Sequence, residues 1–209
     1  MGQEGNTEKK LNVQAKSLFL ELGNVGTGSA MTSLSNMLGT ELIYTPPKLL
    51  EVRYEDLSRW FVESEENVAG VLVPFEGEIS GFLIQIYRLS TAKKILGILL
   101  GPEHEEERAL DREGLDLLHE ISNIMASSCL LALSSYTASR IRVLESAVSV
   151  DMAGSILTEL FGTASGIYGA GLGLGACFCL SGEDSDNRIL LILGSDSMSR
   201  FLEELEVGA

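Results

Sequence analysis

The sequence repeats itself at an offset of 99 residues, and this repeat constrains the fold more than any other feature. Residues 17–35 align with residues 116–134 without a gap, and six of the 19 aligned positions are identical. Similarity at a fixed offset indicates a structural unit that occurs more than once. We therefore expect residues of about 11–100 and about 112–208 to form two copies of one unit.

Each copy reads as a long helix, a short β-type stretch, a short amphipathic helix, two strands and a closing helix. We expect these elements over residues 17–35, 40–47, 54–64, 67–77, 78–88 and 90–101, and then over 116–134, 139–150, 153–162, 164–182, 187–194 and 195–207, with Ser195 as the last N-cap. Each copy alone would have a small core. We therefore predict an α+β fold, formed by an internally duplicated, pseudo-twofold single domain over residues 1–209. It should have a shared antiparallel sheet, two long helices over residues 17–35 and 116–134, which we call the motif helices, and additional short helices. The charged segment 101–114 joins the copies.

Charge and hydropathy exclude several classes of function. The net charge is −15, and so acidic a chain repels nucleic acid, which is bound by clustered Lys and Arg. The apolar runs at 95–100 and 189–193 are far shorter than the ~20 residues that span a bilayer. The first ten residues lack the apolar segment of a secretory signal. We expect a cytoplasmic protein without membrane insertion.

The cysteines are expected to be reduced. Cys129, Cys177 and Cys179 are odd in number and lie among apolar residues, which argues against disulfides and favours buried thiols. Cys177 and Cys179 alternate with apolar residues as in a strand, so both should point to one face. His104 and His119 form no second pair at ligand spacing, and we expect no bound metal.

Each motif helix should have a packing face and a polar face, because successive residues turn by about 100°. In the first helix, the polar face is expected to comprise Ser17, Glu21, Asn24 and Gly28, and the packing face Ala15, Leu18, Leu22, Val25 and Ser29. In the second helix, the polar face is expected to comprise Asp116, Glu120, Asn123 and Ser127, and the packing face Leu117, Ile121, Ile124 and Ser128. Solvated Glu and Asn residues are common on helices. An acid and an amide at the same spacing in both copies, beside small residues, nevertheless favour a functional site.

Glycines in the first helix need a reason, since each costs roughly 1 kcal/mol relative to alanine in a helix interior. Gly23, Gly26 and Gly28 do not form the dinucleotide fingerprint, which follows a strand at a turn into a helix. No Walker lysine follows them. We expect the glycines to thin the helix so that another surface can approach closely.

The first motif helix resembles the CheC/CheX/FliY family of chemotaxis phosphatases. That family's signature is Asp or Ser, three residues, Glu, two residues, Asn, twenty-two residues and Pro. Ser17, Glu21, Asn24 and Pro47 satisfy it completely. The resemblance covers nearly the whole chain and is best to CheC-like members.

The second copy departs from the signature at its last position. Asp116, Glu120 and Asn123 satisfy the first three terms, and Ser146 stands in place of proline. Proline would fix φ and remove a backbone donor after the helix. We expect the substitution to perturb the frame of this site while leaving its chemical groups in place.

The resemblance implies that the substrate is the phosphorylated response regulator CheY, which carries an aspartyl phosphate and its own Mg²⁺. Asn24 and Asn123 would each orient the attacking water. Glu21 and Glu120 would pair with a lysine beside the phosphate. The supporting motif residues would be Ser17, Asp116 and Pro47. On this interpretation the chain needs no cofactor of its own.

Two other interpretations remain open. CheC-like proteins also bind CheD, a receptor glutamine deamidase, so the chain could be a non-catalytic adaptor; the resemblance suggests that CheD docks near Asp151. The third alternative is an enzyme that acts on a small phosphorylated metabolite, but the sequence contains no basic phosphate pocket.

Overall fold

The computed structural model describes residues 13–52, 65–101, 110–164, 171–183 and 187–194, and residue 197. The helices predicted over 54–64 and 195–207, with the N-cap Ser195, lie outside the described residues, apart from residue 197. His104 and most of the joining segment also lie outside them.

The described elements alternate between helices and antiparallel strands. In chain order they are α1 (Val13–Leu38), β1 (Leu42–Tyr44), β2 (Lys48–Val52), β3 (Asn67–Gly77), β4 (Gly81–Arg88), α3 (Leu89–Leu100), α4 (Arg112–Thr137), β5 (Ile141–Val143), β6 (Ala147–Met152), α5 (Ala153–Ala164), β7 (Gly171–Leu180) and β8 (Asn187–Leu193). The two motif helices and the β3–β4 hairpin occur where the sequence predicted them. The strand predicted from residue 164 begins only at residue 171, because α5 occupies residue 164.

Within the described residues, the long helix and the four strands of each half have the same topology. The helices α1 and α4 are each 26 residues long, and α4, β5 and β6 begin 99 residues after α1, β1 and β2. The eight-stranded sheet has the order β1-β7-β8-β4-β3-β5, with β2 also paired to β7 and β6 to β3. When each strand is replaced by its equivalent in the other half (β1 by β5, β3 by β7 and β4 by β8), the same order is obtained, read from the opposite edge. The fold is therefore the predicted α+β arrangement, with a pseudo-twofold axis between β4 and β8.

The single β-type stretch predicted after each motif helix is in fact two strands with a bulge between them. Tyr44 pairs with Phe178, whereas Lys48 pairs with Gly175, so four steps on one strand oppose three on the other. The second half repeats this, because β5 and β6 pair with β3 with the same one-residue excess. Both motif positions after the helices, Pro47 and Ser146, lie in these bulges.

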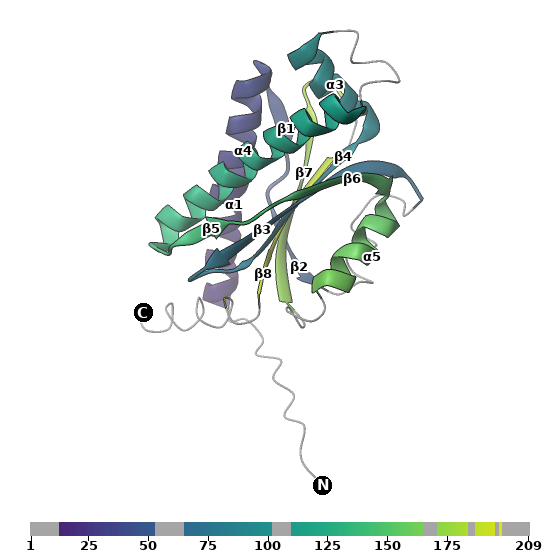
Figure 1. The fold of residues 1–209 in the computed structure, drawn as a ribbon. Helices are drawn as coiled ribbons and strands as arrows, with labels where there is room; N and C mark the ends of the chain where they lie inside the picture. The colour runs from purple at the N-terminus through teal and green to yellow at the C-terminus, as the bar shows by residue number, and fades with distance from the viewer. Residues whose placement is uncertain are drawn as a thin grey trace.

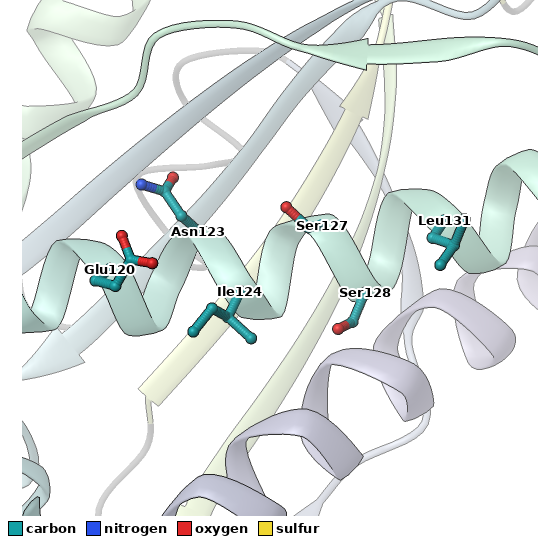
Figure 2. Close-up of a pocket in the computed structure, with 6 residues that line it drawn as sticks. All are labelled: Glu120, Asn123, Ile124, Ser127, Ser128 and Leu131. Atoms are coloured by element: carbon teal, nitrogen blue, oxygen red, sulfur yellow. The ribbon is translucent and has the colours of Figure 1, made fainter.

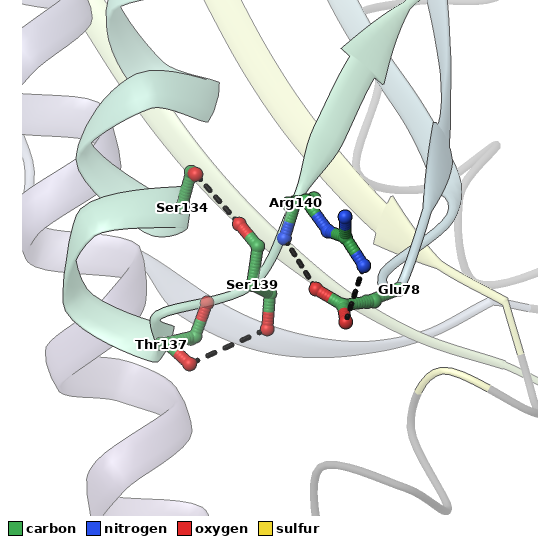
Figure 3. Close-up of polar contacts among 5 residues, drawn as sticks. All are labelled: Glu78, Ser134, Thr137, Ser139 and Arg140. Atoms are coloured by element: carbon green, nitrogen blue, oxygen red, sulfur yellow. Dashed lines mark hydrogen bonds and ion pairs between the residues drawn. The ribbon is translucent and has the colours of Figure 1, made fainter.

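Equivalent turns lead from each motif helix into its bulged strand. Gly39 (φ 62°) and Ala138 (φ 52°) both adopt the left-handed conformation that commonly ends a helix. The hydroxyls of Ser35 and Ser134 each donate to the carbonyl five residues ahead, at 2.6 Å. Figure 3 shows the second turn. This shared geometry fixes where each bulge lies relative to its helix.

The sheet is covered on both faces. The helices α1, α3 and α4 pack on one face, with Phe19, Leu34, Leu118 and Met125 among the buried residues. On the other face α5 contributes Ile156 and its neighbours to a smaller cluster. In Figure 1, α1 and α4 cross on one side of the strands and α5 lies on the other.

Among the described helices, α4 is long and apolar enough by composition to cross a membrane. Nine of its residues are buried in the fold, among them Leu118, Ile121 and Met125. Core packing accounts for this apolar face, so the composition is weak support for a membrane span.

The cysteine prediction holds for one of the three thiols. Cys129 is buried, whereas Cys177 and Cys179 are only half-buried. These two alternate with Phe178, which lies in the core beneath the motif helices, so their shared face is the opposite one. All three are free thiols.

Candidate functional site

The two motif helices cross through small residues. The Ser29 hydroxyl donates to the Ser128 carbonyl at 3.0 Å, and the Ser33 hydroxyl donates to the Ser128 hydroxyl at 2.6 Å. Ser29 and Ser128 are 99 residues apart, which is the repeat offset. Equivalent residues therefore meet at the crossing, which lies near the pseudo-twofold axis.

Two of the three glycines in α1 allow close packing, and the third does not need to. A β-carbon on Gly26 would lie 2.9 Å from Cys129 Sγ, and one on Gly23 would lie 3.0 Å from Pro47 Cγ. Next to Gly28 the nearest group is the Tyr44 hydroxyl, at 3.6 Å, an ordinary contact. The expectation that the glycines let another surface approach closely is confirmed for Gly23 and Gly26 and stays a prediction for Gly28.

The predicted packing faces are wrong at two positions. Val25 and Ile124 are 37% and 40% exposed. In α1 burial follows Leu22, Gly26 and Ala30 instead, because the glycine and alanine allow α4 to pack there. The contact face is thus set by the smallest side chains, which a hydropathy pattern does not mark.

The first motif presents its polar groups on the open face of α1. Ser17, Glu21 and Asn24 are exposed, as predicted, and Pro47 is buried. Pro47 packs over Gly23, the residue before Asn24. The motif proline therefore supports the helix directly beneath the amide.

A residue of the other half reaches the first motif. Tyr136, from the last turn of α4, lies beside Glu21; desolvation and then the neighbouring Glu21 carboxylate raise the pKa of the Tyr136 hydroxyl. The repeat could not reveal this contact, since the residue equivalent to Tyr136 is Met37.

The second motif borders a shallow hollow on α4 with a volume of ≈ 290 Å³. Figure 2 shows Glu120, Asn123 and Ser127 on one side of the helix, and Ile124 and Ser128 on the side toward α1. We call this the α4 hollow; it is lined by Glu120, Asn123, Ile124, Ser127, Ser128 and Leu131. Ile124 and Leu131 give it exposed apolar area beside the acid and the amide.

Asn123 is less accessible than expected. Asp116 and Glu120 are exposed, but Asn123 is half-buried because the Ser146 hydroxyl donates to Asn123 Oδ1 at 2.7 Å. The same hydroxyl lies 2.5 Å from His119 Nε2. The sequence marked Ser146 only as a missing proline and His119 only as an unmatched ligand. The bond from Ser146 to Asn123 and the contact between Ser146 and His119 both depend on the bulge after α4.

The remaining predicted positions lie apart from the motifs. Asp151 is exposed on β6, and its Oδ1 accepts from the Met152 amide at 2.6 Å. Within the described part of the chain, no group of three or more His, Cys, Asp or Glu side chains is arranged to hold a metal ion. That Mg²⁺ comes from the partner stays a prediction.

Comparison with known proteins agrees with this fold and motif. Residues 16–51 match the model of the CheC-like family, and this range contains the whole first motif. The chain is 27% identical to the CheY-P phosphatase CheC of Bacillus subtilis (strain 168) over 144 residues, which is 68% of this chain and 69% of the relative.

Three solved structures share the fold. FliY of Thermotoga maritima matches with a TM-score of 0.70 and 19% identity, over 93% of this chain and 96% of that chain. FliM of H. pylori, in complex with SpeE, matches with a TM-score of 0.64 and 8% identity, over 95% of this chain and 97% of that chain. CheX of Borrelia burgdorferi, in complex with CheY, BeF3 and Mg²⁺, matches with a TM-score of 0.54 and 19% identity, over 84% of this chain and 96% of that chain.

Together, these matches show that the chain is similar in sequence to the CheC-like family and shares its fold with FliY, FliM and CheX. The sequence similarity over 144 residues is to CheC. The resemblance to the CheC-like family is thereby confirmed in sequence and in fold.

Proposed function

We propose that this chain is a cytoplasmic phosphatase that hydrolyses the aspartyl phosphate of a CheY-type response regulator. The observation that carries the proposal is the acid–amide pair, one turn apart on the open faces of both α1 and α4. Similarity to the CheY-P phosphatase CheC and the fold shared with a CheY-bound CheX support it.

In the proposed reaction, Asn24 and Asn123 each hold a water in line with the phosphorus of a docked regulator. Attack by this water breaks the acyl phosphate into the aspartate carboxylate and inorganic phosphate. A carboxamide suits the task because it both donates and accepts hydrogen bonds and does not titrate. Positioning supplies most of the catalysis in phosphoryl transfer.

The glutamates would fix the docked geometry. Glu21 and Glu120 are exposed and would each pair with a lysine of the regulator, while Ser17 and Asp116 would support the same surface. The regulator would supply Mg²⁺, and the residues of this chain bind and orient only. Exposed Ile124 and Leu131 in the α4 hollow would add apolar contact area.

The test is the rate at which a cognate regulator, phosphorylated by acetyl phosphate, loses phosphate in the presence of the purified chain. We expect acceleration by the wild type, a partial loss in Asn24→Ala and in Asn123→Ala, and complete loss in the double variant. Circular dichroism verifies that each variant is folded. A folded double variant with wild-type activity would contradict the carboxamide mechanism.

A second candidate function is the adaptor that binds CheD. The observation that favours it is the surface of β6, where Val150 and Met152 are 39% and 44% exposed on either side of exposed Asp151. Apolar residues at an exposed sheet edge suit a protein partner.

Asp151→Lys tests the adaptor function. The reversed charge should weaken binding of purified CheD at least tenfold in titration calorimetry, a loss of about 1.4 kcal/mol, while phosphatase activity without CheD stays unchanged. Unaltered CheD binding would show that the interface lies elsewhere.

A further inference from the structure

Three neighbouring positions change character together between the two motifs. The offset of 99 pairs Leu20 with His119, Gly23 with Ser122 and Pro47 with Ser146. In the first half this set has no side-chain hydrogen-bonding group. In the second half all three side chains can form hydrogen bonds.

The structure explains why these changes occur as a set. A β-carbon at Gly23 would lie 3.0 Å from Pro47 Cγ, closer than such atoms normally pack. Ser122 has a β-carbon at the equivalent position and is fully buried, so a proline at 146 would be crowded. The second motif therefore needs another residue at 146 to support its amide.

The hydrogen bonds of Ser146 show which group donates and which accepts at this position. Ser146 Oγ is 2.7 Å from Asn123 Oδ1 and 2.5 Å from His119 Nε2. A serine hydroxyl has one proton. Because that proton goes to Asn123 Oδ1, Ser146 Oγ accepts the proton on His119 Nε2. The chain of donors runs from His119 through Ser146 to Asn123.

We propose that Ser146, held by His119, is a positioning residue that orients the Asn123 carboxamide in place of the motif proline. With Oδ1 fixed by Ser146, the amide Nδ2 keeps its protons for a water or a docked phosphate. Pro47 has no side-chain donor and gives Asn24 no such bond. The two sites therefore achieve one orientation by different means, Asn24 through packing and Asn123 through a hydroxyl relay.

The relay can be tested without any substrate. In the ¹⁵N-labelled full chain, the Asn123 side-chain amide resonances are identified by their loss in Asn123→Ala. We expect Ser146→Ala to shift this pair of resonances and Ser146→Thr, which keeps the hydroxyl, to leave it near the wild-type position. His119→Leu should shift it in the same direction as Ser146→Ala. Wild-type resonances in Ser146→Ala would overturn the relay.

The catalytic consequence rests on the proposed function and is measured in the Asn24→Ala background, where only the second site acts. Loss of one neutral hydrogen bond predicts a fall in kcat of about fivefold in Ser146→Ala, with KM changed by less than about twofold. Ser146→Thr should restore kcat. Ser135→Ala, an exposed serine further along α4, is the matched control and should behave as the parent.

The two measurements separate the possible failures. If the resonances shift as expected but kcat in Ser146→Ala equals that of its parent, the positioning role is wrong. If KM rises while kcat is unchanged, Ser146 acts in docking, which also overturns it. If even the wild type is inactive, the proposed function fails, and the resonances alone decide whether the relay exists.

Discussion

At the residue scale, the second motif is anchored from below by buried polar groups. The Tyr87 hydroxyl donates to Gln85 Oε1 at 2.7 Å and lies 3.0 Å from Ser122 Oγ. Gln85 Nε2 donates to the Ser122 carbonyl at 2.8 Å. Buried networks of this kind fix geometry when every member has a partner. Strand β4 thereby holds α4 at the residue directly before Asn123.

Burial of Cys129 makes the fold sensitive to alkaline pH. Burial raises the pKa of its thiol from 9.0 to about 12, so between these values the thiol ionises only in the unfolded chain. Burial of the protonated thiol contributes its full share to the free energy of unfolding below pH 9. This share is lost as the pH rises from 9 toward 12, by about 1.4 kcal/mol per pH unit.

The measurement is urea unfolding at pH 8, 9 and 10 of the wild type and of Cys129→Ala, because the comparison cancels the contribution of Tyr87, whose pKa is also raised by burial. Cys129→Ala should be less stable than the wild type at pH 8, because it leaves a cavity. Its free energy of unfolding should then fall less steeply between pH 9 and 10. Parallel pH profiles for the two proteins would contradict the assignment.

At the element scale, local pattern was sufficient for the described helices α1, α3, α4 and α5 and for the β3–β4 hairpin. Their periodicity and turn residues are contained within each segment. The division of each β-type stretch into two strands was not predicted, because the bulge is defined only by a partner strand: β1 and β2 pair with β7, more than 100 residues away. Long-range register leaves no local signal.

The glycines of α1 predict opposite effects for two alanine substitutions that lie two residues apart and point to different sides of the helix. Gly26→Ala places a methyl group 2.9 Å from the buried Cys129 sulfur; overpacking of ~1–3 kcal/mol, offset by ~1 kcal/mol of helix propensity, should lower the free energy of unfolding by about 1 kcal/mol. Gly28→Ala meets only an ordinary contact at 3.6 Å and should raise it by about 0.5–1 kcal/mol.

Chemical denaturation of both variants beside the wild type decides the point. Each variant serves as the control for the other, because both make the same chemical change in the same helix. Stabilisation by both would show that the crossing of α1 and α4 is looser than the packing at Gly26 implies.

At the scale of the whole molecule, the halves are joined through their strands. The β4–β8 pair, the β1 and β2 pairs with β7, and the β5 and β6 pairs with β3 all cross between halves. The repeat predicted a shared sheet and the spacing of both motifs. It could not predict the relay to Asn123 or the Tyr136–Glu21 contact, because a repeat reveals what the halves share and these contacts are where they differ.

This interleaving predicts that neither half folds alone. In a fragment of residues 1–101, β1 and β2 would lack their partner β7, and the core face of α1 would lack α4. In a fragment of residues 102–209, β5 and β6 would lack β3 in the same way. Each fragment should give the circular dichroism and poor amide dispersion of an unfolded chain, because the lost apolar contacts span both halves.

An equimolar mixture of the fragments should recover the sheet, since all cross-half ladders are available again. The intact chain should unfold in urea in one transition, with near- and far-ultraviolet circular dichroism coincident. Monomeric fragment 1–101 with cooperative unfolding of its own would instead divide the chain into two domains. A self-associated fragment would still require a partner half, because the pseudo-twofold axis allows a second copy to take the place of residues 102–209.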